Sequence, residues 1–61
     1  MGEKLRKLRI KRNWSQGELS RRSGIHRTYI SGIEKGLRNP ALKNINRLAK
    51  ALNISPSEVF N

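Results

Sequence analysis

The residues best suited to recognise another molecule lie in the stretch RTYISGIEK, residues 27–35. Successive residues of a helix are turned by about 100°, which places the small and polar members on one arc: Arg27, Thr28, Ser31, Gly32 and Lys35. Ile30 and Ile33 fall on the opposite side. Arginine can donate two hydrogen bonds to a guanine edge, and a hydroxyl can hydrogen-bond a base edge, while Gly32 leaves room for close approach. The arc therefore fits base readout, although a solvated helix face has the same pattern.

The charge of the chain indicates a polyanionic partner. Its 61 residues include 14 Lys and Arg against 4 acidic residues, a net charge of +10, and such an excess is typical of proteins that bind nucleic acid or anionic membranes. A membrane binder needs a wide apolar face with large side chains. The sequence has one Trp, one Tyr and one Phe, and no apolar run near the length of a membrane span. These features favour nucleic acid in the cytoplasm over a membrane, while a basic surface that serves solubility is the other interpretation.

Length and composition exclude several other classes of function. We expect residues 1–61 to form one domain. With no cysteine and one histidine, the sequence predicts neither disulfides nor a metal site. It lacks a paired-carboxylate site, a phosphate-cradling glycine loop and a recognisable Ser-His-acid triad, so we expect no enzyme, cofactor or small-molecule substrate.

Hydrophobic spacing predicts five short helices. The first covers residues 3–12, with Leu5 and Leu8 on one face, and ends at Asn13 in a left-handed conformation. Ser15 begins the second, residues 16–23, through a capping box in which Glu18 reaches back to the serine N–H. Gly24 ends this helix.

The remaining elements follow the same signals. The third helix covers residues 27–35 and ends at Gly36, and Pro40 suits the first position of the fourth. Apolar residues at helical spacing define the inner face of the fourth helix: Leu42, Ile45, Leu48, Ala49 and Leu52. It closes at Asn53, and a second capping box, Ser55 to Glu58, begins a short fifth helix. The sequence thus predicts an all-α, compact five-helix bundle.

The second and third helices with their glycine turn have the size of a helix-turn-helix. Further motifs make the resemblance specific: S-Q-x-E-L at residues 15–19, R-T-Y-I-S-G-I-E at 27–34, R-N-P at 38–40 and L-A-K-A-L at 48–52. The chain resembles the Cro and phage-repressor-type (XRE) helix-turn-helix family, with a lambda-repressor-like domain. It is most similar to the controller proteins of restriction-modification systems.

The resemblance implies a cytoplasmic, nucleoid-associated transcriptional regulator, such as a repressor, that binds a palindromic operator as a homodimer. It also implies roles for individual residues. The expected base contacts are Arg27, Thr28 and Ser31; the expected DNA-backbone contacts are Gln16, Tyr29, Lys35, Arg38 and Asn39. Backbone contacts position the protein, and base contacts specify the sequence.

The same resemblance suggests an ion pair between Arg9 and Glu34. It would tie the third helix, called the reading helix because it carries the expected base contacts, to the rest of the fold. A loose surface pair would stabilise little, whereas Glu34 on the inner arc favours a partly buried pair. The chain departs from the family pattern at Ser20 and Ser23, where alanine and a larger apolar residue are usual. It also departs at Trp14, which replaces a common leucine.

Three questions stay open at this level. Val59 and Phe60 are either dimer contacts or the last core residues. His26 is either a pH sensor or, in the cap position, a capping or phosphate-binding residue. The alternative function is a protein-interaction module on the same fold, with incidental basic charge.

Overall fold

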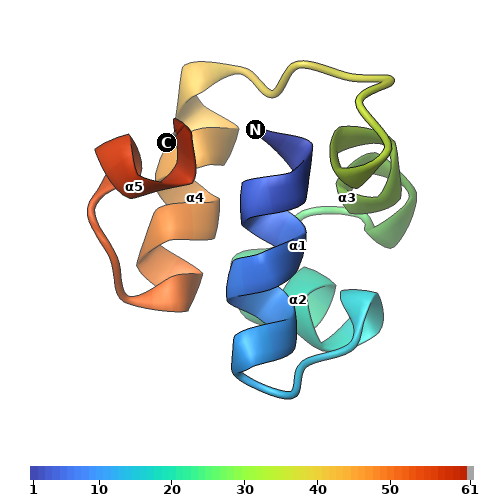
Figure 1. The fold of residues 1–61 in the computed structure, drawn as a ribbon, viewed down its shortest axis with the longest axis vertical. Coiled ribbons are helices and arrows are strands. Elements are labelled where there is room, and N and C mark those ends of the chain that lie inside the picture. The colour runs from blue at the N-terminus through green and yellow to red at the C-terminus, as the bar shows by residue number, and fades with distance from the viewer. Residues whose placement is uncertain (61) are drawn as a thin grey trace.

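The computed structural model describes residues 1–60, without the side chain of Phe60. Its helices are α1 (Gly2–Lys11), α2 (Gln16–Ser23), α3 (Arg27–Glu34), α4 (Leu42–Leu52) and α5 (Pro56–Phe60). Residues 1–60 contain no strand, so the predicted all-α fold with five helices is confirmed. In Figure 1, α1 lies between α3 on one side and the α4–α5 pair on the other, and it packs against both α3 and α5.

Left-handed residues follow the helices where the sequence predicted them. Asn13 has φ 60°, Gly24 φ 73°, Gly36 φ 77° and Asn53 φ 57°. Asparagine and glycine tolerate this conformation best. The reading helix ends at Glu34, with Lys35 as its C-cap, one residue earlier than predicted.

Each predicted capping box forms only one of its two hydrogen bonds. At α2, Ser15 Oγ accepts from the N–H of Glu18 at 3.0 Å, but the Glu18 carboxylate accepts from Arg21 and Arg22. At α5, Glu58 Oε2 accepts from the N–H of Ser55 at 3.0 Å. The prediction that Glu18 reaches back to Ser15 is wrong, because two guanidinium groups within one helical turn compete for that carboxylate.

The start of α4 also differs from the prediction. Ala41 is the N-cap in an extended conformation, so Pro40 precedes the helix instead of occupying its first position. Leu42 then begins α4 with 68% of its surface exposed. Leu42 keeps the spacing of the apolar residues, but its assignment to the inner face is wrong, because the buried face of α4 begins one turn later, at Ile45.

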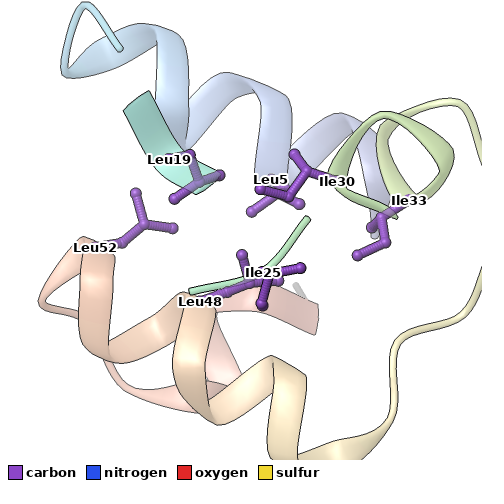
Figure 2. Close-up of a cluster of buried hydrophobic side chains, with 7 residues drawn as sticks. All are labelled: Leu5, Leu19, Ile25, Ile30, Ile33, Leu48 and Leu52. Atoms are coloured by element: carbon purple, nitrogen blue, oxygen red, sulfur yellow. The ribbon is translucent and has the colours of Figure 1, made fainter. Parts of the chain in front are cut away.

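The main hydrophobic core receives side chains from α1 to α4 and from the turn between α2 and α3. Figure 2 shows its seven buried side chains converging from α1, α2, the turn after α2, α3 and α4: Leu5, Leu19, Ile25, Ile30, Ile33, Leu48 and Leu52. A second cluster joins α4 to α5 through Ile45, Ala49 and Val59. Val59 is fully buried within its own chain, so of the two alternatives left open for it, the structure contains the core residue. The prediction for Phe60 concerns a side chain outside the described part.

Two close contacts fasten α1 to its neighbours. Gly2 lies against the last turn of α3, where a Cβ atom would overlap the carbonyl oxygen of Ile33 and lie 2.8 Å from that of Glu34. At the other end of α1, Arg12 Nη2 donates to the carbonyl of Leu52, where the negative end of the α4 dipole favours a cation. None of the helices in residues 1–60 is long and apolar enough to cross a membrane.

Gly2→Ala is expected to lower the free energy of unfolding by about 2 kcal/mol, because the added methyl group meets backbone that cannot move aside. Gly17→Ala is the matched control. A Cβ there meets only Ser15 Oγ at 3.7 Å, so its stability should equal or exceed that of the parent. Urea unfolding followed by circular dichroism compares the two. Equal stability of both variants would contradict the close approach of α1 to α3.

Candidate nucleic-acid interface

The reading helix α3 has one buried face and one exposed face. Ile30 and Ile33 are 0% and 1% exposed, whereas Arg27, Thr28 and Lys35 are exposed and Ser31 is partly exposed. The polar arc expected from helical spacing is therefore presented to solvent at these four positions.

Two open depressions flank this exposed face. The first, of about 610 Å³, lies between the start of α2 and α3 and is lined by Arg9, Ser15, Gln16, Gly17, Arg27, Thr28 and Ser31. The second, of about 430 Å³, is lined by Thr28, Ser31, Gly32, Lys35, Leu37 and Arg38. Thr28 and Ser31 line both depressions, so the structure brings the three predicted base-contact residues together around one surface. The exposed Leu37 was missed by the sequence analysis, since it lies in a loop outside any periodic pattern.

Arg9 and Glu34 form a bidentate ion pair that joins α1 to α3. Arg9 Nε lies 2.7 Å from Glu34 Oε2, and Arg9 Nη2 lies 2.9 Å from Glu34 Oε1. The side chains are 11% and 4% exposed, so the structure contains the partly buried form of the pair. Arg9 Nη1 also donates to the carbonyl of Trp14 at 2.7 Å.

Gln16 completes this network from the first residue of α2. Its Nε2 donates to Glu34 Oε1 at 3.1 Å, which orients the side chain at the rim of the first depression. Burial disfavours the charged form of Glu34, but hydrogen bonds from Arg9 and Gln16 outweigh it and lower the pKa of this carboxyl. The hydrogen bond to Glu34 likewise raises the pKa of Arg9.

Arg38 crosses the reading helix at Gly32. A Cβ atom on Gly32 would lie 3.0 Å from Arg38 Cδ and 3.2 Å from its Cγ, and the Arg38 guanidinium carbon lies 5.5 Å from the ring centre of Tyr29. The N–H groups of Leu37 and Arg38 both donate to the carbonyl of Gly32, at 2.8 and 3.2 Å. The expectation that Gly32 leaves open room for an approaching ligand is therefore wrong, because Arg38 from the following loop fills that room.

The remaining predicted residues lie at the edges of this surface. Asn39 is exposed beyond Arg38. His26 is the exposed N-cap of α3, but its side chain makes no capping hydrogen bond, so the capping role predicted for it is wrong. Within residues 1–60, no group of three or more His, Cys, Asp or Glu side chains could hold a metal ion.

Comparisons with known proteins identify the sequence and the fold. The family model described as Helix-turn-helix matches residues 5–59. Control protein C.BamHI of Bacillus amyloliquefaciens is 44% identical over 98% of this chain and 75% of its own length. Control protein C.MunI of Mycoplasma sp is 41% identical over 98% of this chain and 82% of its own.

A solved structure supports the same assignment as the family model and the two control proteins. The crystal structure of the restriction-modification controller protein C.AhdI from Aeromonas hydrophila superposes with a TM-score of 0.93 at 47% identity, covering 97% of this chain and 89% of that protein. The resemblance to restriction-modification controller proteins that the motifs indicated is confirmed.

Glu34→Gln is expected to lower the free energy of unfolding at pH 7 by about 3 kcal/mol, because it leaves the buried part of Arg9 without its counter-charge. The lowered pKa of Glu34 in the folded state also predicts acid sensitivity. The pair stabilises the fold above the unfolded-state pKa of about 4.3, and this contribution is lost as the pH falls through the lower folded-state value.

Urea unfolding between pH 7 and pH 2 measures this effect. The parent should lose stability below about pH 5 more steeply than Glu34→Gln does. Glu18→Gln is the control, because its carboxylate pairs with Arg21 and Arg22 on an exposed helix surface, where ion pairs stabilise a fold very little. Parallel pH curves for the parent and Glu34→Gln would show that the pair does not stabilise the fold.

Proposed function

The chain belongs to the helix-turn-helix family, and we propose that it is a DNA-binding transcriptional regulator of the restriction-modification controller type. In this proposal residues 1–61 act as one DNA-binding domain, which recognises a palindromic operator in duplex DNA as a homodimer. A regulator of this kind acts at the nucleoid, in the cytoplasm.

One observation carries the proposal: the exposed face of α3 combines cations, hydroxyls and two flanking depressions on a helix whose other face is anchored in the core. An α-helix fits the major groove, where each base pair presents a distinct pattern of donors and acceptors. The buried Ile30 and Ile33 anchor α3 in the core, so its exposed side chains would enter the groove in a fixed orientation.

The three base contacts differ in their chemistry. Arg27, at the first position of α3, can donate two hydrogen bonds to O6 and N7 of guanine. The hydroxyl of Thr28 can bond a base edge while its methyl group contacts a thymine methyl. Ser31, one turn further along, lies between the two depressions and offers a short donor or acceptor to the next base pair.

The backbone contacts surround these residues. Gln16 keeps one amide N–H for a phosphate while the other donates to Glu34. Lys35, Arg38 and Asn39 follow the C-terminal end of the reading helix and supply donors to the neighbouring phosphates, and Tyr29 supports Arg38 through its ring. Such contacts fix the register of the protein on the duplex without reading its sequence.

The length of the reading helix supports the proposed dimeric binding. The eight residues of α3 extend over about 12 Å, enough for one short half-site. Two half-sites one helical turn apart lie about 34 Å from centre to centre. A second protomer related by two-fold symmetry would place its own reading helix in the second half-site.

Selection of bound sequences from a random duplex pool tests the proposal. A two-fold symmetric consensus is expected, and affinity for it should fall steeply with added salt as counterions are released from the phosphates. A consensus without symmetry would contradict the homodimer. No duplex binding even at low salt would contradict DNA binding and favour the protein-interaction module.

Arg27→Ala is expected to weaken binding to the selected operator by about 1 to 3 kcal/mol and to relax the preference at one base pair of each half-site. Lys35→Ala should weaken all sequences equally and reduce the slope of log affinity against log salt by about 1. Arg47→Ala is the control, since Arg47 is exposed on α4, outside the residues proposed to meet DNA. An unchanged preference in Arg27→Ala would exclude base reading by Arg27.

A further inference from the structure

Two serine side chains of α2 hold the turn between α2 and α3. This turn consists of Gly24, Ile25 and His26, between the last residue of α2 and the first of α3. Ile25 is 5% exposed, and its side chain belongs to the main core cluster. A buried residue needs partners for its N–H and its carbonyl, because an unpaired backbone group without water is costly.

Both partners are serine side chains of α2. Ser20 Oγ donates to the carbonyl of Ile25 at 2.5 Å, and the N–H of Ile25 donates to Ser23 Oγ at 3.2 Å. The carbonyl, the N–H and the side chain of Ile25 are thus all held in place, the first two by hydroxyls and the third by the core.

The direction of α3 depends on this residue. The helix starts two residues after Ile25 and extends about 12 Å, so a tilt of about 10° at the turn would move its far end by about 2 Å. A binding site loses its hydrogen-bond geometry when its groups shift by more than about 0.5 Å. Contacts to phosphates tolerate such a shift better, because long flexible side chains make them.

We propose that Ser20 and Ser23 are positioning residues that set sequence discrimination without touching DNA. By holding the carbonyl and the N–H of Ile25, they orient α3 so that its exposed face and the start of α2 meet one duplex together. The inference rests on the proposed function, since it concerns how well one DNA sequence is separated from others.

Single variants Ser20→Ala and Ser23→Ala test the inference, with Asn46→Ala on the exposed side of α4 as the control. Dissociation constants are measured for the selected operator and for a scrambled duplex, at a temperature where circular dichroism shows each variant folded. The ratio of the dissociation constant for the scrambled duplex to that for the operator should fall about tenfold in each serine variant, the effect of losing one base contact through the tilt of α3. Binding to the scrambled duplex should stay within about twofold of the parent, because the phosphate contacts are unchanged.

Two further variants separate positioning from stability alone. Ser23→Thr keeps the hydroxyl and should retain the discrimination of the parent. Ser20→Ala combined with Arg27→Ala should lose less operator affinity than the sum of the single losses, because both act through the same base contact. Additive losses would show that Ser20 acts independently of the reading face.

The inference is overturned if the serine variants keep the discrimination of the parent, if they weaken both duplexes equally, or if neither folds. The last result would mean that the two hydroxyls serve the stability of the whole fold. A parent protein that does not itself distinguish the operator from the scrambled duplex would instead contradict the proposed function.

Discussion

The structure depends on the charge of one carboxylate, that of Glu34. It lies in the last turn of α3 with a side chain only 4% exposed, where both burial and the negative end of the helix dipole disfavour a negative charge. Arg9 meets it with two parallel hydrogen bonds. A buried ion pair is weak evidence for net stability, so its main contribution is geometric: the planar fork of Arg9 fixes where the reading helix ends.

Through this ion pair, α1 helps to position α3, although no residue of α1 is proposed to contact DNA. Arg9 reaches α3 and the carbonyl of Trp14, and Arg12, one turn later, reaches the end of α4 at Leu52. Gly2 allows the first turn of α1 to rest on the carbonyls of α3. The orientation of the elements proposed to face DNA thus depends on α1, which packs behind them.

Local signals were sufficient for most of the fold, because helix ends and apolar spacing depend on neighbours in sequence. The left-handed stops at Asn13 and Asn53 and the buried pair Ile30 and Ile33 follow from such signals. Features that depend on the path of the chain could not be predicted. Whether Leu42 is covered depends on where other helices end, and Arg38 fills the space beside Gly32 only because the intervening loop folds back.

The side-chain partners show the same limit. A capping-box pattern states which groups can pair, but nearby arginines changed the partner of Glu18. The departure at Glu18 reflects competition between the backbone N–H of Ser15 and two charged arginine side chains for one carboxylate.

The division of α3 into an anchored and an exposed face has a consequence for how such proteins diversify. Arg27, Thr28 and Ser31 contribute little to the core, so mutations at these positions can accumulate while the fold persists. Glu34, Ile30 and Ile33 lack this freedom, because burial and the ion pair with Arg9 hold α3 in the fold.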